Sequence, residues 1–324
     1  MKIVLVNSTG PMGSTVVGSL IEKFDFINIP LRKLGLHDYL VGLKDIDDPF
    51  FLEQFTKILD QHCILRQSGG VSVRDRNNAI PRKLVDKDLA LNYLASNSEN
   101  LKTIRGLYNT SRNAYSHAIQ YKKAGNYSEM HVEYTTDIIN YNMEELEKAY
   151  HEVFDEVFMI HLHRDFVDWL ESLFSQRFIH PKFKTRNFFV FHSAYNQYRR
   201  YEEKTKNLPG LHLEFKSLFL PNTKEVINDI SKLLKMPIPN ISFENEQYDL
   251  YGKLSDFDTT FTQADTENLY LSRISRSIIQ RCISRGKITI FHDILIYGLF
   301  LIESFRFQIN FHALIKVKKF YNNQ

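Results

Sequence analysis

The sequence predicts an α/β fold, with a parallel β-sheet flanked by helices in three layers and with helical additions. Short apolar runs that suit buried parallel strands alternate along the chain with amphipathic helical patterns. The clearest run, residues 157–162, leads after three polar residues into a helical pattern that begins at Phe166. This alternation favours a parallel sheet, because the connection between two parallel strands is usually a helix.

The composition is that of an ordinary folded protein of 324 residues, 43% of them hydrophobic and 24% charged. No repeat or low-complexity linker is evident. We therefore expect a single domain over residues 1–324, with a core of about 2–240 and a C-terminal helical extension of about 250–324. A net charge of +3 gives no reason to expect nucleic acid as a partner. The two cysteines, Cys63 and Cys282, match neither a disulfide framework nor a zinc site, and we expect no metal.

The chain enters a strand-like run directly and shows no secretory signal. Its longest apolar run, residues 294–302, is much shorter than the roughly 20 residues that span a bilayer. We therefore expect a cytoplasmic protein without a transmembrane segment. The apolar C-terminal helix is expected to pack on the domain, and a homodimer contact or a shallow membrane attachment are the alternatives.

In the first half of the chain, apolar spacing predicts these elements in order: strand Lys2–Val6, helix Ser14–Phe24, strand 26–29, helix 50–65, helical patterns over 86–124, strand Met130–Tyr134 and helix Met143–Phe154. Residues 66–82 are rich in Gly, Arg and Asn and predict a long loop. The elements expected after residue 178 are helix 191–206, strand Leu211–Phe215, a helix ending at Leu234, a basic helix 265–285 and an apolar helix 288–318. Asn222 and Glu225 predict a capping box for the helix that ends at Leu234.

Arg164 stands where the strand 157–162 gives way to a helix, and ligands bind at this edge of open α/β sheets. Asp165 is the expected N-cap of that helix. Ser172 follows eight residues after Arg164, about two helical turns further along. A guanidinium and a hydroxyl suit a phosphate group. The alternative is a buried strand that ends in an arginine paired with a charged neighbour.

The turn after the first strand is rich in glycine and hydroxyl side chains and contains Gly10, Pro11, Met12, Gly13, Ser14 and Thr15. Backbone amides in such a turn, together with a helix N-terminus, bind phosphate or sulfate. No lysine precedes Ser14, so the turn is not a Walker A loop, which argues against an ATP- or GTP-hydrolysing enzyme. The alternative is a tight turn without a ligand.

The two motifs together resemble those of sulfotransferases that use PAPS (3′-phosphoadenosine 5′-phosphosulfate), of the bacterial or carbohydrate type. Arg164 and Ser172 match the family's 3′-phosphate motif, with Phe166 in place of the usual proline. Gly13-Ser14-Thr15 matches the end of its 5′-phosphosulfate loop, where Pro11 replaces the usual basic residue.

Two further segments add to the resemblance, which covers about residues 2–240. The segment 133–136 is similar to the Glu-Lys-Thr-Pro of bacterial and carbohydrate members, and 211–237 is similar to the family's late strand and helix. The order of the four segments makes the resemblance more specific than any one of them.

The resemblance implies a P-loop-NTPase-like sulfotransferase fold and a transferase that moves a sulfuryl group from PAPS to a hydroxyl of a small-molecule or carbohydrate acceptor. It implies PAPS-binding residues at Gly10, Pro11, Met12, Gly13, Ser14, Thr15, Arg164 and Ser172. Glu133 is the expected catalytic base, with a structural carboxylate as the alternative and Asp75, His117 and His131 as other choices. The loss of a cation at Pro11 favours a second hypothesis, a non-catalytic relative that binds PAP or PAPS without turnover.

Overall fold

The structure is a computed structural model, and it describes residues 1–9, 12–21, 24, 87–103, 105–106, 108–110, 113–114, 130–135, 142–174, 191–218, 222–239, 247–248, 254–255, 271–284 and 288–321. The chain divides into two compact units. The first comprises Met1–Ser8, Gly13–His163 and Leu208–Thr262, and the second comprises Thr9–Met12, Arg164–Asn207 and Gln263–Gln324.

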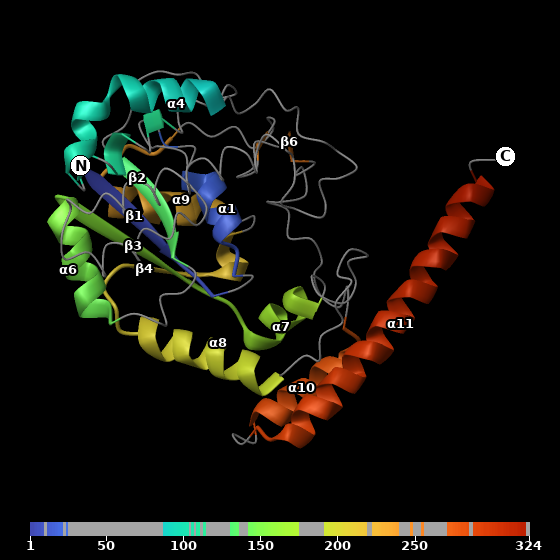
Figure 1. Cartoon of the computed structure of the whole chain (residues 1–324). Coiled ribbons are helices and arrows are strands. Elements are labelled where there is room, and N and C mark those ends of the chain that lie inside the picture. Colours follow the sequence, from blue (N-terminus) through green and yellow to red (C-terminus); the bar gives the residue numbers. More distant parts are fainter. Residues whose placement is uncertain are drawn as a thin grey trace. The chain divides into compact units, whose positions relative to one another are not determined.

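The first unit contains a four-stranded parallel sheet in the order β2-β1-β3-β4 (Figure 1). The strands are β1 (Lys2–Asn7), β2 (Met130–Thr135), β3 (Glu156–His163) and β4 (Leu211–Glu214). The two central strands are mostly apolar and buried, as strands covered on both faces must be. The predicted α/β class with a parallel sheet is confirmed.

The strand order places a topological switch point between β1 and β3. From β1 the chain continues to β2 on one side, and from β3 it continues to β4 on the other. In open α/β sheets, the crevice at the carboxyl ends of two such strands is where ligands bind. Asn7, at the end of β1, is paired in register with His161 of β3 at this point.

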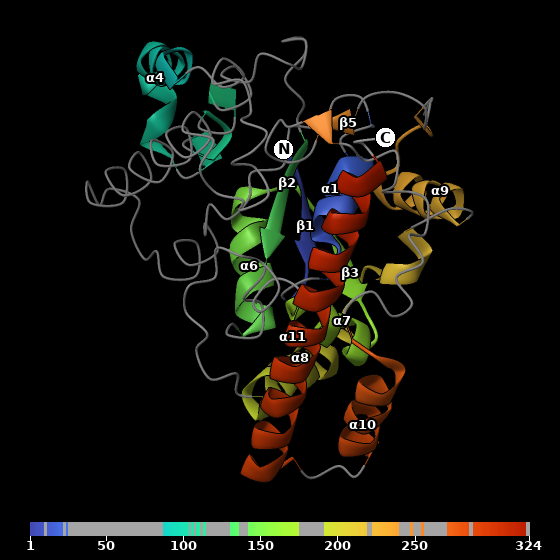
Figure 2. The same ribbon diagram turned by 90° about the vertical axis from the view of Figure 1, so that its right-hand side faces the viewer.

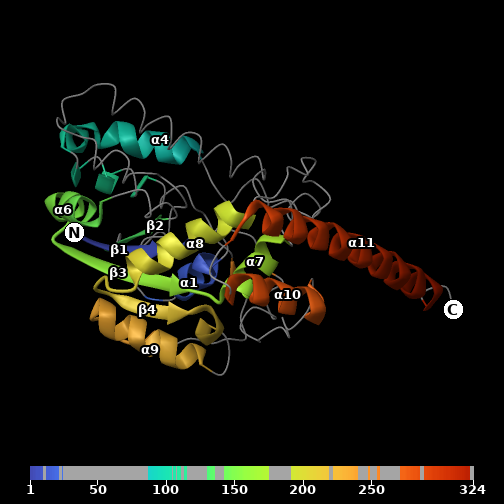
Figure 3. The same cartoon turned by 90° about the horizontal axis from the view of Figure 1, so that it is seen from below.

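Helices lie on both faces of the sheet. Figure 2 shows α6 (Met143–Val153) on one side of the strands and α1 (Ser14–Ile21) and α9 (Thr223–Leu234) on the other. Figure 3 likewise shows α6 and α9 on opposite sides. Each is amphipathic and turns its apolar stripe inward; α6, for example, buries Leu146, Tyr150 and Val153. The flanking layers of the prediction are confirmed.

The predicted capping box of α9 is wrong. Asn222 precedes the helix with a helical backbone conformation (φ −77°, ψ −12°) and makes no side-chain capping bond. Instead, the hydroxyl of Thr223 donates to the carbonyl of Leu218 at 3.1 Å. The helix ends where Lys235 adopts a left-handed conformation (φ 55°), which closes its last turn.

Several element boundaries differ from the sequence-based expectation. β4 stops at Glu214, since the chain then turns into the 3₁₀ helix η5 (Phe215–Leu218). The helical region before β2 includes α4 (Lys87–Ser96) and the 3₁₀ helix η2 (Ser98–Lys102). A separate antiparallel pair, β5 (Gln247–Tyr248) with β6 (Leu254–Ser255), was not predicted. The expected elements at 26–29 and 50–65 and the expected loop 66–82 lie outside the described residues.

The second unit is helical and contains α7 (Phe166–Phe174), α8 (Phe191–Thr205), α10 (Arg273–Ser284) and α11 (Ile290–Tyr321). α11 packs against α8 and α10, and α10 packs against α7. Aromatic rings fill its interior; the ring of Phe166 lies 4.9 Å from that of Tyr198 and 5.1 Å from that of Tyr195.

The predicted C-terminal extension thus shares a unit with α7 and α8, which lie in the middle of the sequence. That the whole chain forms one domain stays a prediction. Among the helices that the structure describes, none is long and apolar enough to cross a membrane.

Candidate functional site

A row of polar residues crosses the sheet near its carboxyl edge, one from each strand. Thr135, Asn7, His161 and His212 are register partners on β2, β1, β3 and β4. The hydroxyl of Thr135 donates to Asn7 Oδ1, and Asn7 Nδ2 donates to His161 Nδ1 at 3.1 Å. Thr135, Asn7 and His161 are fully buried, so these bonds offset the cost of removing polar groups from water.

The hydrogen bonds fix the tautomers of the imidazoles in this row. His161 Nε2 lies 3.1 Å from the carbonyl of Pro209, which can only accept, so Nε2 carries the proton and Nδ1 accepts from Asn7. Burial lowers the pKa of His161 to about 4, which keeps its ring neutral at physiological pH.

His163 joins this row of polar residues through a hydrogen bond to His212. His212 Nε2 donates to the carbonyl of Leu208 at 3.1 Å, and its Nδ1 accepts from His163 Nε2 at 2.9 Å. The ring of His212 stacks on those of His161 and His163 at centroid distances of 4.8 and 5.1 Å. Within the described part of the chain, no group of His, Cys, Asp or Glu side chains is arranged to hold a metal ion.

Arg164 directly follows β3, as the sequence predicts, and is half-buried. Its carbonyl accepts a hydrogen bond of 2.7 Å from the hydroxyl of Tyr198 on α8. Asp165 then begins the helix: its Oδ1 accepts from the amides of Val167 at 2.9 Å and Asp168 at 3.2 Å. The predicted N-cap is therefore confirmed, and it fixes the direction in which the chain leaves the strand.

Ser172 lies on α7 and is half-buried, and the same helix carries two acidic residues close to it in sequence. Asp168 precedes it by four residues, so both occupy one face of the helix, and Glu171 is its neighbour. Burial lowers the pKa of Arg164 to about 10, although the charges of Asp168 and Glu171 oppose this effect. Arg164 therefore remains cationic at neutral pH.

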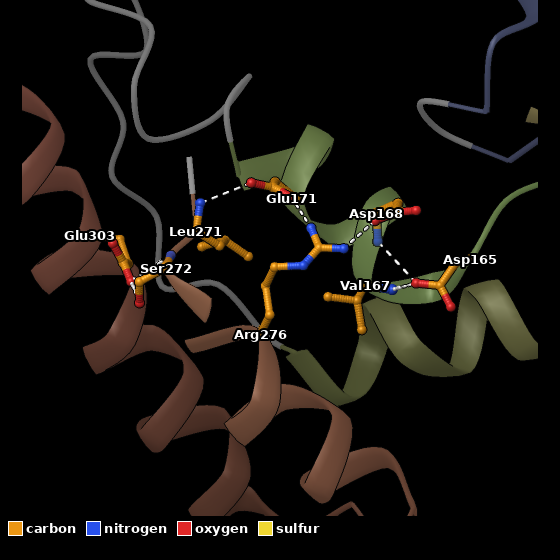
Figure 4. A network of polar contacts seen from close by, with 8 residues as sticks. All are labelled: Asp165, Val167, Asp168, Glu171, Leu271, Ser272, Arg276 and Glu303. Carbon is orange, nitrogen blue, oxygen red and sulfur yellow. Dashed lines mark hydrogen bonds and ion pairs between the residues drawn. The ribbon is translucent and has the colours of Figure 1, made fainter. Parts of the chain in front are cut away.

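Arg276 of α10 pairs with these carboxylates, although it belongs to none of the predicted motifs. In Figure 4, its guanidinium contacts Glu171 through Nη1 and Asp168 through Nη2. The amide of Leu271 donates to the second oxygen of Glu171 at 2.9 Å. The only sequence signal was the basic character of the helix, because its partners lie more than a hundred residues away.

The beginning of the glycine-containing turn lies against the helix that follows Arg164. The carbonyl of Thr9 accepts a hydrogen bond of 2.7 Å from Trp169 Nε1 on α7, and its hydroxyl accepts one of 3.2 Å from Gln197 on α8. Met12 is buried, with its sulfur 3.5 Å from the amide of Thr9. Gly10 and Pro11 lie outside the described residues, as does the side chain of Thr15.

Gly13 and Ser14 form the start of α1. Gly13 has a φ of +92°, and a Cβ placed on it would lie 2.7 Å from a ring carbon of Phe215. Its carbonyl accepts from the amides of Val16 at 2.9 Å and Val17 at 3.1 Å. Only glycine fits both this backbone conformation and this contact. Ser14 opens the helix, and amides in the first turn of a helix point to where an anion would bind.

Glu133 lies inside β2 rather than at its end, opposite Leu5 of β1. Its side chain is fully buried, and Oε2 accepts from the hydroxyls of Tyr108 at 2.7 Å and Tyr150 at 3.4 Å. These contacts are those of a structural carboxylate, the alternative that the sequence allowed. Its role as a catalytic base stays a prediction.

Of the other bases that the sequence offered, His131 is fully buried, with Nε2 lying 3.1 Å from Asn109 Oδ1. Asp75 and His117 lie outside the described residues.

No protein-family model and no curated protein matches the chain. The solved structures that are similar to it include two sulfotransferase domains. One is a sulfotransferase domain from the Synechococcus PCC 7002 olefin synthase, with 13% identity and a TM-score of 0.42, covering 73% of this chain and 74% of that one. The other is a sulfotransferase domain from the curacin biosynthetic pathway, with 9% identity, the same TM-score of 0.42 and the same coverage of 73% and 74%.

Proposed function

We propose that this protein is a sulfotransferase that moves a sulfuryl group from PAPS to a hydroxyl of a small-molecule or carbohydrate acceptor. The observation that carries the proposal is the contact between Thr9 and Trp169, because it joins the start of the predicted sulfate-binding turn to the helix that follows Arg164 and bears Ser172. Arg164, a half-buried cation at the end of β3, fits the 3′-phosphate, and the hydroxyl of Ser172 supplies a second donor.

In the proposed reaction, the acceptor oxygen forms a bond to sulfur while the bond from sulfur to the bridging phosphate oxygen breaks. PAP leaves with the electron pair of that bond, and the acceptor's proton passes to a base. The amides of the turn and of the first turn of α1 would stabilise the charge on the sulfuryl group. The donor site that we propose comprises Gly10, Pro11, Met12, Gly13, Ser14, Thr15, Arg164 and Ser172.

A second function, nucleotide binding without turnover, is favoured by two specific observations. Pro11 stands at the position where the sulfotransferase motif has a basic residue near the leaving group. The expected base, Glu133, is fully buried and accepts hydrogen bonds from two tyrosines. Under this alternative the protein binds PAP or PAPS through the same residues and transfers nothing.

Binding of PAP tests both functions. We expect PAP to raise the unfolding temperature of the protein, since a ligand that binds only the native state stabilises it. Arg164→Ala should weaken PAP binding by at least about tenfold, as expected for the loss of a charge-assisted contact. Arg200→Ala, an exposed arginine on α8, is the matched control and should bind as the wild type does.

Two results would overturn the proposal: the absence of any stabilisation by PAP, or an unchanged PAP affinity in Arg164→Ala. If PAP binds, incubation with PAPS labelled in its sulfate distinguishes the two functions. Release or transfer of the label supports the enzyme, and intact PAPS supports the non-catalytic alternative.

A further inference from the structure

α10 contributes a guanidinium group to the face of α7 that carries the predicted phosphate-binding serine. Figure 4 shows the side chain of Arg276 reaching Glu171 and Asp168 together. The relative exposures of the three side chains are only 20%, 8% and 17%, so the pairs are shielded from water and salt. Removing Arg276 would therefore leave two carboxylates without a counter-ion in a poorly solvated place, which costs more than breaking a pair on an open surface.

The backbone of α10 holds this guanidinium in place. Arg276 belongs to the first turn of the helix, and its amide donates to the carbonyl of Ser272 at 3.0 Å. Ser272 caps the helix by accepting the amide of Ser275 at 3.2 Å. The amide of Leu271 donates to Glu171, so the carboxylate is held both by the side chain and by the backbone that precedes α10.

The two carboxylates are an obstacle to a phosphate at this place. Asp168 is one helical turn from Ser172, and Glu171 acts on Arg164 as Asp168 does, so both charges would repel a dianion bound to Arg164 and Ser172. Both also act electrostatically on Arg164, and they therefore compete with a phosphate for that cation. Asp165, the third carboxylate near Arg164, is engaged by the backbone amides at the start of α7.

We propose that Arg276 is a positioning residue of the 3′-phosphate site. It holds Asp168 and Glu171 and balances their charge, so that Arg164 and Ser172 are able to receive a phosphate group. The inference rests on the proposed function, and it extends the site to a C-terminal helix that the sequence motifs do not reach.

The test compares the affinities of PAP and of adenosine 5′-monophosphate, which lacks the 3′-phosphate, for the full chain and its variants by calorimetry. Arg276→Gln should lower the affinity for PAP by at least about tenfold, since two carboxylates lose their counter-ion. The affinity for adenosine 5′-monophosphate should stay unchanged. Adding Asp168→Asn and Glu171→Gln should restore PAP affinity to within about threefold, because the repulsion is then gone. Arg281→Gln, an exposed position on the same helix, is the matched control.

The outcomes separate this inference from the proposed function. If the wild type does not bind PAP, the proposed function fails and the inference falls with it. If the wild type binds and Arg276→Gln binds equally well, the inference alone is overturned. It is also overturned if the triple variant binds as weakly as Arg276→Gln, because Arg276 would then contact the ligand itself.

If Arg276→Gln does not fold, the double variant Asp168→Asn/Glu171→Gln is compared with the triple variant. Equal PAP affinities support the positioning role, and a further loss on removal of Arg276 contradicts it.

Discussion

His161 is a buried imidazole near the carboxyl edge of the sheet, and its pKa is lowered by burial. Its imidazole is buried between Asn7 and Pro209, with Nδ1 accepting and Nε2 donating, so a further proton would have to displace the bond from Asn7. The arrangement is thus stable only with a neutral ring, and it ties β1 to β3 at the point where the proposed ligand site begins.

The first prediction concerns the pH dependence of stability. Burial lowers the pKa of His161 from 6.5 to about 4, so the unfolded chain takes up this proton more readily than the folded protein. The contribution of the neutral His161 ring to the free energy of unfolding is fully present above pH 6.5 and is lost as the pH falls toward 4. Urea unfolding at pH 7 and pH 4.5 should show a loss of about 2–3 kcal/mol from this group.

His161→Gln provides the control for this titration, because it keeps a polar side chain and removes the ionisable ring. Its stability should fall less steeply between the two pH values than that of the wild type. Equal slopes for the two proteins would show that the loss comes from other groups.

A second prediction at this scale concerns the backbone of Gly13. Gly13→Ala should lower the free energy of unfolding by about 1–3 kcal/mol, because it combines a positive φ with a contact to Phe215 that must shift. Gly298→Ala is the matched control: a Cβ there meets nothing within 4 Å, and alanine favours the helix. A loss of similar size in both variants, measured by urea unfolding, would contradict the assignment of strain to Gly13.

Single residues were predictable from the sequence where their partners are local. Arg164 and Asp165 follow from a strand that changes into a helix within a few residues, and the cap forms as expected. Arg276 and the tyrosine partners of Glu133 were not predictable, since each contact joins segments that only the tertiary fold brings together.

At the scale of elements, α10 and α11 are joined through a buried acid. Glu303 on α11 accepts from the amide of Ser272 at 2.9 Å and from the hydroxyls of Ser272 and Ser275, and its other oxygen forms an ion pair with Arg306 Nε at 2.6 Å. Burial alone would raise the pKa of Glu303, but these hydrogen bonds and the charge of Arg306 outweigh it, so the pKa lies below its usual value. One helix thereby caps the N-terminus of another.

We predict that Glu303→Gln weakens this cap and destabilises the protein by about 1–3 kcal/mol, because an uncharged amide makes weaker hydrogen bonds. Hydrogen exchange should show faster exchange of the amides of residues 272–276, together with a lower unfolding midpoint. Glu203→Gln, which removes an exposed pair with Arg199 on α8, is the control and should cost less than about 0.5 kcal/mol. Unchanged exchange at the start of α10 would refute the capping role.

The spacing of apolar residues predicted which described segments form the strands of the main sheet and which form long helices. It often did not predict where these elements end. α6 and β3 match within one residue, because apolar spacing decides both. The capping box of α9 failed because Asn222 has a helical backbone conformation and Thr223 bonds to Leu218 instead. β4 ends early because Phe215 turns away into η5, where its ring lies next to Gly13.

At the scale of the whole molecule, two of the boundaries between the units follow the carboxyl ends of strands. The chain passes from the first unit to the second after Ser8, just beyond β1, and again after His163, the last residue of β3. The parallel sheet was predictable from its apolar runs. The units were not, because the second unit combines residues 164–207 with 263–324, and no local pattern links such distant segments.

The bond between Trp169 and Thr9 also gives this protein a built-in optical reporter. Trp169 is the single tryptophan of the chain, so all indole emission comes from one buried ring. The emission of an indole shifts with the hydrogen bond that its N–H makes, and here that bond ends on the turn proposed to hold the sulfate end of the donor. Fluorescence of the unlabelled protein can therefore follow events at this turn in real time.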